Sequence, residues 1–526
     1  MDTKALRQKI LDLAIRGKLV PQDPNDEPAS VLLERIREQK MQMVKEGKLK
    51  AKDITNDTII FVGEDNLHYE KFQDGTVKCI EDEIPFEVPE GWEWVRLVSI
   101  CLKVTDGTHH SPDNFPTGEY KYITAKNIKL NGIVLDDITY VTAEVHKEIF
   151  ARCNPEFGDI LYIKDGATSG IATVNTLHEE FSMLSSVALL KPSIGIDNWY
   201  MCYAMQSPYF YNTTRGDMKG VGITRITLNM LTSRLIPIPP QNEQRQISAN
   251  TSKLIELIVS IEKSKDDVLE LIATTKSKIL DLAIRGKLVP QDPNDEPASI
   301  LLERIRAEKE ELIKQGKIKR DKKKSVIFKG DDNSYYQQTG DLIESISTWE
   351  LEELPDNWVL CCLGELCDYG NCNNVDADSI AGNAWILDLE DIEKNTGKVL
   401  RKIRKNERDF TSTKHSFYKG QVLYSKLRPY LNKVIIADED GFCTSEILPL
   451  EFANVVLPQY ALYYLMSPTF LRYAKQCSYG VKMPRLGTAD GRKAIFPLPP
   501  IKEQYRIANS ISKCFTQIDN ILSALL

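Results

Sequence analysis

The sequence predicts a chain of mixed α and β structure (α+β): two similar α/β domains separated by a pair of long, antiparallel coiled-coil helices, in a circular, pseudo-twofold internal repeat. The segment KILDLAIRGKLVPQDPNDEPAS occurs twice without a change, at residues 9–30 and 278–299. A heptad pattern of apolar residues precedes the second copy. When the two halves are aligned, the last residues of the chain fall at about the same point of the repeat as the first residues. A repeat this long indicates a duplicated domain pair and not a solenoid.

Composition places the chain among ordinary globular proteins. It has 526 residues, 42% hydrophobic and 27% charged, which indicates two to four domains. No apolar run is long enough to span a bilayer and the N-terminus MDTKALRQKI has no signal-peptide core, so we expect a cytosolic protein. Eleven cysteines in a long chain indicate reduced thiols. The net charge of −8 weighs against nucleic-acid binding unless positive charge is concentrated locally.

Short matched anchors continue the repeat beyond the identical segment, while the sequence between them diverges. PEGWEWVRLVSIC at 89–101 matches PDNWVLCCLGELC at 355–367, and GDILY at 158–162 matches GQVLY at 420–424. Near the end of each divergent segment, PIPPQNEQRQI at 237–247 matches PLPPIKEQYRI at 497–507. The offset between the halves falls from 269 to 260 residues. We therefore expect one fold with two different surfaces.

A long helix is predicted from the residues after Pro240 to about Arg285, where Gly286 supplies a C-terminal signal. Its length of about 40 residues corresponds to a rod of roughly 60 Å. Apolar residues recur along it at coiled-coil spacing. The seam consists of Ile247, Leu254, Ile261 and Val268, with Ile258, Ile272 and Ile279 between them.

The chain ends predict a second rod, assembled from residues 503–526 and 2–15. Its seam consists of Ile507, Ile511, Ile518 and Ile521, followed by Leu6 and Ile10. Two such rods packed antiparallel would close the molecule into a pseudo-twofold ring with adjacent termini. The alternative is a coiled coil that dimerises two chains; the two matching halves favour the internal pair.

The remaining conserved segments follow each rod. A Pro/Asp/Asn loop leads into a short amphipathic helix at 29–46 and 298–315, with Ser30 and Ser299 as expected caps. Basic, irregular linkers should follow. The predicted organisation is a helical region 1–50, a linker 51–84, a first α/β domain 85–240, a central helical region 241–316, a linker 317–348, a second α/β domain 349–500 and a C-terminal helix 501–526.

The duplicated KILDLAIRGKLVPQDPNDEPAS with LLERIR, the PxxW motif that begins each divergent segment and the PxPPxxEQ motif that ends it resemble the specificity subunit of Type I restriction–modification systems. The resemblance covers essentially the whole chain. It implies that 85–240 and 349–500 are target-recognition domains that each read half of a split, asymmetric DNA target. It also implies that the helices set the spacer and dock two adenine methyltransferase subunits, to which ATP-driven restriction subunits can attach. The chain itself would be non-catalytic, cytoplasmic and prokaryotic, without a cofactor; S-adenosylmethionine, ATP and Mg²⁺ would belong to the partners.

Local charge supports DNA contact in the second domain. Residues 398–433 contain eleven Lys or Arg against Glu407 and Asp409, a balance of +9. Clustered cations neutralise phosphates, while side chains that reach base edges read sequence. Within this stretch KLRPYLNK, at 426–433, follows GQVLY; its counterpart KDGATSG, at 164–170, follows GDILY. Different side chains at one structural position are expected of two readers.

Two further loop pairs carry groups that can hydrogen-bond bases: 105–114 with 369–378, and 215–225 with 477–485. For any single residue of these loops, a solvated turn is the alternative. The candidate DNA-binding residues of the first domain are Thr108, His109, His110, Lys164, Thr168, Ser169, Arg215, Lys219 and Arg225. Those of the second are Asn373, Asn374, Lys426, Arg428, Tyr430, Lys433, Tyr479, Lys482 and Arg485.

Catalytic and metal motifs are weak or missing in the sequence. No G-x-x-x-x-G-K-[ST] motif or amino-methyltransferase tetrad occurs, which disfavours a stand-alone DNA enzyme. The nuclease-like Pro112-Asp113 with Glu119-Tyr120-Lys121 has too short a spacing. Four cysteines at 361, 362, 367 and 372 lack C-x2-C spacing, so we expect buried thiols without zinc. A scaffold that bridges two partner subunits without reading DNA is the remaining alternative function.

Overall fold

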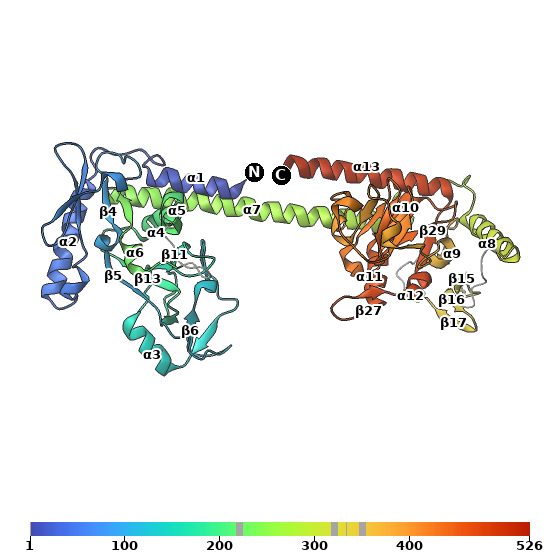
Figure 1. The fold of residues 1–526 in the computed structure, drawn as a ribbon, viewed down its shortest axis with the longest axis horizontal. Helices are drawn as coiled ribbons and strands as arrows, with labels where there is room; N and C mark the ends of the chain where they lie inside the picture. The colour runs from blue at the N-terminus through green and yellow to red at the C-terminus, as the bar shows by residue number, and fades with distance from the viewer. Residues whose placement is uncertain (1, 217–224, 317–324, 333, 347–353, 526) are drawn as a thin grey trace. The chain divides into compact units, whose positions relative to one another are not determined.

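The structure is a computed structural model that describes residues 2–216, 225–316, 325–332, 334–346 and 354–525 (Figure 1). The chain divides into two compact units, residues 1–264 (unit 1) and 265–526 (unit 2), and each is described by itself. The long helix α7 (Gln241–Ile284) crosses this boundary. No helix within the described ranges is both long and apolar enough to cross a membrane.

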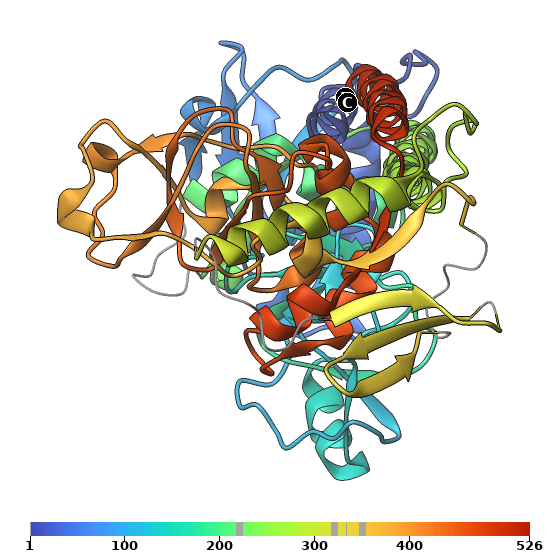
Figure 2. The same ribbon diagram turned by 90° about the vertical axis from the view of Figure 1, so that its right-hand side faces the viewer.

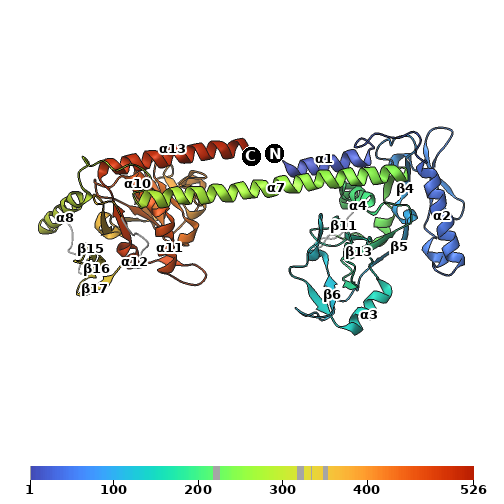
Figure 3. The ribbon, with the colours of Figure 1, turned by 180° about the vertical axis from the view of Figure 1, so that it is seen from behind.

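Unit 1 contains a pair of antiparallel helices, α1 and the first half of α7 (Figure 3). The end of α1 lies near the start of α7, because Gln22 Nε2 donates to Glu243 Oε1 at 3.0 Å. Further along, Leu11 of α1 packs with Tyr203 and Ile255. The helices of this unit besides α7 are α1 (Thr3–Ile15), α2 (Ala29–Lys45), α3 (Ala143–Arg152), α4 (Asn198–Gln206), α5 (Pro208–Gly216) and α6 (Leu228–Thr232).

The central sheet of unit 1 has the strand order β11-β10-β13-β5, and its apolar residues pack against α4 and the conserved helices. Its strands are β5 (Cys101–Asp106), β10 (Ile160–Ile163), β11 (Ala172–Val174) and β13 (Val187–Pro192). A second sheet has the order β12-β6-β9, formed by β12 (Phe181–Met183), β6 (Tyr120–Ile123) and β9 (Thr139–Val141). The two-stranded pairs are β4 (Glu93–Arg96) with β14 (Leu235–Ile238) and β7 (Ile128–Lys129) with β8 (Gly132–Ile133).

Unit 2 pairs the second half of α7 with α13 (Ile501–Leu525), again antiparallel. Lys276 of α7 contacts Asp519 at 2.6 Å, and Gln291, beyond the end of α7, donates to Glu503 at 2.7 Å. The other helices of this unit are α8 (Ala298–Lys314), α9 (Leu363–Leu366), α10 (Pro458–Leu465), α11 (Pro468–Gln476) and α12 (Thr488–Lys493).

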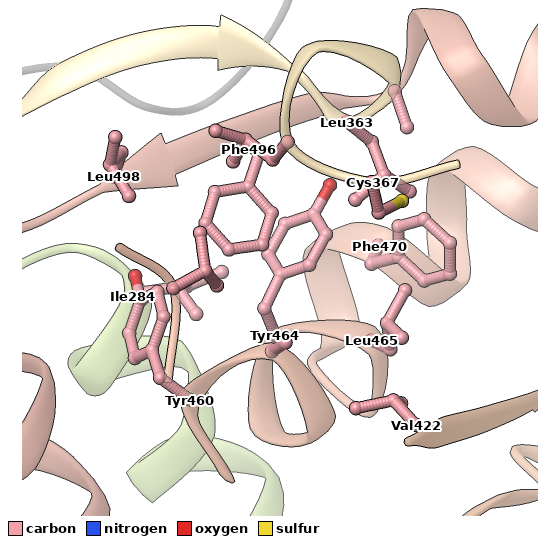
Figure 4. Packing of buried hydrophobic residues seen from close by; sticks show 14 of the residues in the cluster. Ile284, Leu363, Cys367, Val422, Tyr460, Tyr464, Leu465, Phe470, Phe496 and Leu498 are labelled. Atoms are coloured by element: carbon pink, nitrogen blue, oxygen red, sulfur yellow. The ribbon is translucent and has the colours of Figure 1, made fainter. Parts of the chain in front are cut away.

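The sheets of unit 2 repeat the plan with local changes. The sheet β24-β23-β26 is formed by β24 (Val434–Ile436), β23 (Val422–Ser425) and β26 (Ile447–Leu450). The sheet β19-β22-β25-β20-β21 is formed by β19 (Asn374–Val375), β22 (Lys414–Phe417), β25 (Gly441–Thr444), β20 (Trp385–Leu387) and β21 (Ile403–Arg404). The two-stranded pairs are β18 (Val359–Cys362) with β29 (Ile495–Leu498) and β27 (Ser478–Tyr479) with β28 (Arg485–Leu486). Figure 4 shows how Tyr460, Tyr464 and Phe496 fill the core between these elements.

The matched sequence anchors make equivalent hydrogen bonds in both units. The hydroxyl of Tyr200 donates to Pro237 O at 2.7 Å, and that of Tyr460 donates to Pro497 O at 2.8 Å. The backbone N–H of Ala29 donates to Gly91 O at 2.8 Å, and that of Ala298 donates to Asn357 O at 2.9 Å. The hydrogen bonds of Ala29 and Ala298 fasten the start of α2 and of α8 to the matched PxxW motif in each half.

The predicted rod and short helices form, but their caps differ from the prediction. Helix α7 ends at Ile284, and Gly286 has the positive φ of 67° expected of a helix terminator. Helices α2 and α8 begin at Ala29 and Ala298, each preceded by a proline as N-cap without a side-chain hydrogen bond. The expected caps Ser30 and Ser299 were therefore wrong, because these serines lie inside the helices.

The predicted linkers are not irregular throughout. Residues 51–84 contain the antiparallel sheet of β1 (Ile59–Val62), β2 (His68–Lys71) and β3 (Val77–Cys79). Residues 317–348 contain the matching sheet of β15 (Ser325–Lys329), β16 (Tyr335–Thr339) and β17 (Leu342–Ser345), drawn in yellow in Figure 2. The basic run 317–324 lies outside the described residues. The sequence signal for these two sheets was the matched pair GEDN at 63–66 and GDDN at 330–333. Asp65 accepts a hydrogen bond from Tyr69 on β2, and Asp332 accepts one from Tyr336 on β16.

Candidate nucleic-acid interface

Three predicted loops of unit 1 are brought together at the ends of β5 and β10. The backbone N–H of Thr108 donates to Met183 O at 2.8 Å, and that of Lys164 donates to Ser186 O at 2.9 Å. The backbone N–H of Ile226 then donates to Lys164 O at 3.0 Å. We call residues 105–110, 164–170 and 225–227 loop cluster 1. Its three segments are far apart in sequence and are held by backbone hydrogen bonds.

A network of ion pairs links the same three segments through their side chains. The carboxylate of Asp106 is almost completely buried and lies 2.5 Å from Arg152 and 3.4 Å from Lys164. His109 lies 3.3 Å from the same carboxylate. Asp165 continues the network, because it lies 3.5 Å from Lys164 and 3.0 Å from Arg225. The arrangement holds exposed cationic groups in fixed positions on a buried acidic support.

Unit 2 builds the equivalent cluster after β23. The backbone N–H of Lys426 donates to Glu446 O at 3.0 Å, and that of Leu486 donates to Lys426 O at 3.0 Å. The backbone N–H of Arg428 donates to Pro484 O at 2.7 Å. Residues 369–378, 426–433 and 477–486 form loop cluster 2. Arg225 forms an isolated β-bridge with Asp165, the residue after Lys164, and Arg485 forms one with Leu427, the residue after Lys426. The predicted alignment of Arg225 with Arg485 is therefore confirmed.

The arginine of each cluster is held by a different carboxylate. Arg225 Nε donates to Asp165 at 3.0 Å, within the loop that follows β10. Arg485 donates through Nε at 3.1 Å and through Nη2 at 2.8 Å to Glu446, and this hydrogen bonding raises the pKa of the Arg485 guanidinium. Ser186 occupies the position of Glu446 in unit 1. The same cation is thus positioned in both units by acids at different places in the sequence.

The loop 369–378 of unit 2 also approaches Lys426. Asn373 Nδ2 donates to Ser416 Oγ at 3.0 Å, and Asn374 pairs with His415 between β19 and β22. Burial lowers the pKa of His415, and the positive charge of Lys426 lowers it further. Burial raises the pKa of the Cys372 thiol, against the effect of the same lysine. Lys426 therefore lies at the meeting point of this loop and the strand ends.

The predicted site residues differ in exposure. Two side chains are buried: Lys164, between Asp106 and Asp165, and Ser169, which donates to Gly166 O. In this conformation they support the loop and are not accessible to DNA. Lys219 lies outside the described residues. The exposed residues are His109, His110, Thr168, Arg225, Asn373, Asn374, Tyr430, Tyr479 and Lys482; the half-buried residues are Thr108, Arg215, Lys426, Arg428, Lys433 and Arg485.

Two half-buried cations are already engaged within their own unit. Arg215 donates to the hydroxyl of Tyr211 and lies over its ring, 5.3 Å from the centroid. Lys433 Nζ donates to Leu389 O, and burial lowers its pKa. Their side chains are thereby directed at the protein. As direct DNA contacts they remain predictions.

The basic segment 398–433 is largely neutralised by acids elsewhere in unit 2, so its local balance of +9 overstates the charge that DNA would meet. Six of its eleven cations form ion pairs with acids outside the segment. Arg408, for example, contacts Asp391 at 2.6 Å, and Lys402 contacts Asp438 at 2.7 Å. Lys426 and Arg428 have no ion pair with any residue that the structure describes. Lys405 and Lys433 donate to backbone carbonyl oxygens. The positive charge of the segment that the described residues do not engage therefore lies at Lys426, Arg428 and the exposed Lys419.

Sequence reasoning missed the acids and one cation that organise the clusters. Asp106, Asp165 and Glu446 lie in or beside predicted loops, but charge counting treats acids only as a deficit. Arg152 comes from the last turn of α3, far from the loops in sequence. Asp165, directly after Lys164, was the one available sequence signal, because Glu446 lies far from Arg485 in sequence.

The cysteine cluster is structural. Cys361, Cys362 and Cys367 are buried, and burial raises the pKa of Cys362 and of Cys367 to about 12. A thiolate, the form that binds metal, is strongly disfavoured at these positions. The nuclease-like motif lies in a mostly exposed segment, where Lys121 pairs with Glu179 at 2.5 Å.

Comparison with known proteins matches both halves of the chain to one family. The family described as Type I restriction modification DNA specificity domain matches residues 89–271 and 355–524. The specificity subunit of the Type I restriction enzyme EcoEI from Escherichia coli is 31% identical over 414 residues, 69% of this chain and 61% of that protein. The EcoAI specificity subunit, also from E. coli, is 30% identical over 70% of this chain and 63% of that protein. The chain thus spans just over three-fifths of the length of these relatives.

A solved structure has a similar fold. It comes from a study of complex assembly and conformational transition of the type I R-M system. The match covers 84% of this chain and 94% of that chain, with a TM-score of 0.51 and 17% identity. At this identity the match establishes likeness of fold alone.

Proposed function

Because the chain belongs to the Type I restriction modification DNA specificity family, we propose that it is the DNA-reading subunit of a Type I restriction–modification complex. Unit 1 would read one half of a split, asymmetric DNA target (half-site 1), and unit 2 the other (half-site 2). The chain would be a non-catalytic subunit of a prokaryotic cytoplasmic complex.

One observation carries this proposal: both units hold the same trio of loops on equivalent strand ends, with different side chains. The loop after β10 is small and polar, and its Asp165 accepts a hydrogen bond from Arg225 of another loop. The loop after β23 presents Lys426, Arg428 and Tyr430. Equivalent frames with unequal hydrogen-bonding groups suit two readers of unequal base sequences.

The partners follow from the proposed function. Two adenine methyltransferase subunits would bind the conserved helices, one at each copy of the repeated segment, and restriction subunits would attach to them. S-adenosylmethionine, ATP and Mg²⁺ would be bound by those partners. Double-stranded DNA would be bound by the loop clusters, with Lys426 and Arg428 among the contacts of unit 2.

The spacer between the half-sites would be set by the helices. In the proposed arrangement α7 and a second rod, assembled from α13 and α1, pack as antiparallel coiled coils in a pseudo-twofold ring. A rod of fixed length fixes the distance and the helical phase between two readers on one duplex. The antiparallel pairs seen within each unit support this arrangement.

The proposal is tested by producing this chain with its cognate modification subunit in a methylation-free bacterial host and mapping modified adenines across the genome. We expect one split, asymmetric motif, methylated on both strands. A stable complex of the two proteins that adds no methylation would refute DNA reading and favour the scaffold alternative. Modification subunit without this chain is the control.

A further inference from the structure

Arg428 has an unusual backbone conformation for its residue type. Its φ of 48° and ψ of 61° are left-handed, which an L-residue adopts at a cost because Cβ approaches the following carbonyl oxygen. Among the described residues, four non-glycine residues have a positive φ, and the other three are Asn66, Asn395 and Asn432. Asparagine tolerates this conformation through local hydrogen bonding, whereas arginine has no such compensation.

The equivalent position in unit 1 is a glycine. Gly166 has a φ of 91° and accepts from the backbone N–H of Ser169 at 3.1 Å. Arg428 accepts from the N–H of Leu431 at 2.9 Å, three residues on as in unit 1. Both loops therefore place a residue of positive φ at the equivalent position, and in both its carbonyl accepts from the N–H three residues on. Unit 1 fills the left-handed position with the residue best suited to it, and unit 2 fills it with arginine.

The backbone around Arg428 is held firmly in this conformation. Its N–H donates to Pro484 O at 2.7 Å, and the N–H of Leu486 donates to Lys426 O at 3.0 Å. The 3₁₀ turn Pro429–Leu431 follows directly. The point from which the side chain extends is therefore fixed by two hydrogen bonds to the segment 477–486 of loop cluster 2.

The guanidinium of Arg428 has an unmet donor. Its Nε is buried and lacks a hydrogen-bond partner among the described residues, although the residue as a whole is only half-buried. Neighbouring arginines differ: Arg485 is held by Glu446 and Arg408 by Asp391. In the described part of the chain, the fold therefore gives the Arg428 guanidinium no carboxylate partner, and the half-buried side chain can meet acceptors of a ligand with its remaining donors.

We propose that Arg428 is a specificity-determining residue that donates to O6 and N7 of a guanine in half-site 2; this inference rests on the proposed function. A phosphate contact needs charge but little precision, and a flexible lysine on an unstrained backbone would serve. A planar guanidinium on a fixed, strained backbone gains most where two acceptors must be met at once. In the major groove, guanine offers that pair of acceptors to arginine.

The test compares the wild type, Arg428→Gly, Arg428→Lys and Asn395→Gly, each with the modification subunit, by genome-wide mapping of methylated adenines. Glycine suits the left-handed backbone, so Arg428→Gly should keep the melting temperature or raise it. We expect selectivity at one guanine position of half-site 2 to fall about 10- to 100-fold. Half-site 1 and the spacer should be unchanged.

The other two variants separate the possible causes. Arg428→Lys keeps the charge but not the planar pair of donors, so it should lose the same guanine selectivity. Asn395→Gly relieves a left-handed residue at an exposed position of the same unit, and its motif should equal that of the wild type.

Two results would overturn the inference. An unchanged half-site 2 in Arg428→Gly would show that the side chain does not read a base. A uniform loss of methylation at all sequences, restored by Arg428→Lys, would identify a phosphate contact instead. Absence of any split motif for the wild type would refute the proposed function itself, and the inference with it.

Discussion

Trp92 donates a hydrogen bond of 2.9 Å from its indole Nε1 to the carboxylate of Glu243, in the first turn of α7. The same carboxylate accepts from Gln22 at 3.0 Å, just beyond α1. Glu243 thereby fastens the helix pair of α1 and α7 to the start of the α/β domain of unit 1. In unit 2, Glu503 accepts from Gln291 at 2.7 Å at the equivalent position. In the proposed function, a rod can set the position of a reading domain only if its end is attached to that domain, and these buried glutamates would provide the attachment.

The burial of Glu243 predicts a pH dependence of stability. Burial raises the pKa of Glu243, so the folded state holds its proton more tightly than the unfolded state does. The contribution of Glu243 to the free energy of unfolding should be highest below the unfolded pKa of about 4.3 and should fall as pH rises through the folded pKa. Glu243→Gln removes this titration. Relative to the wild type, the variant should gain stability with rising pH, measured by urea denaturation from pH 4 to 8.

A matched control for this prediction is Glu270→Gln, because Glu270 is exposed on the same helix α7. It shows the effect of replacing a glutamate on α7 where the side chain is exposed instead of buried. Glu503→Gln should behave like Glu243→Gln, because burial also raises the pKa of Glu503. A difference between Glu243→Gln and the wild type that is constant with pH would contradict the argument.

The repeat made the frame of the molecule predictable from sequence. Identical residues at 9–30 and 278–299 form equivalent helix ends and loops. For example, Gln22 donates to Glu243, and Gln291 donates to the equivalent Glu503. The loop pair 164–170 and 426–433 was also predictable, since each member follows a matched strand. The internal organisation of the loops was not. The burial of Lys164 depends in part on Asp106, an acid that only the fold brings to it.

Lys40 and Asp57 form a buried ion pair that predicts a large loss of stability on single substitution. Their charged atoms lie 2.6 Å apart, and both side chains are almost fully buried. Lys40 also contacts the carbonyl oxygens of Val98 and Ser99. Asp57→Ala leaves a buried cation uncompensated, so we expect a loss of about 3 kcal/mol in the free energy of unfolding of unit 1. Chemical denaturation measures this.

The expected loss lies at the low end of the range that is usual when one partner of a buried ion pair is removed. The reason is that burial raises the pKa of Asp57 to about 6, so the carboxylate is itself poorly stabilised. Its Oδ1 has no hydrogen-bond partner in the described structure. The double variant Lys40→Met with Asp57→Ala removes both charges and should recover most of the loss. If the double variant were less stable than Asp57→Ala alone, the pair would not be the cause.

The acids that position Arg225 and Arg485 predict independent effects on the two half-sites. Glu446→Gln removes the carboxylate that holds Arg485, so it should lower selectivity within half-site 2 about tenfold and leave half-site 1 unchanged. Asp165→Asn should lower selectivity within half-site 1 and leave half-site 2 unchanged, because Asp165 holds Arg225 in unit 1. Mapping of methylated adenines for both variants checks the prediction, and each variant serves as the control of the other. An equal effect of one variant on both half-sites would rule out separate readers.

The length of α7 predicts the spacer. One heptad inserted after Lys265, with a matching heptad added to the C-terminal helix, lengthens each rod by about 10 Å, or close to three base pairs. Longer rods hold the two reading domains farther apart along the duplex, so the methylated motif should keep both half-site sequences and have a changed spacer. Seven Gly/Ser residues inserted at the exposed turn Asp74–Gly75 lengthen the chain without lengthening a rod, and that variant should keep the wild-type spacer. Altered half-site bases with an unchanged spacer would mean that the helices do not measure the distance.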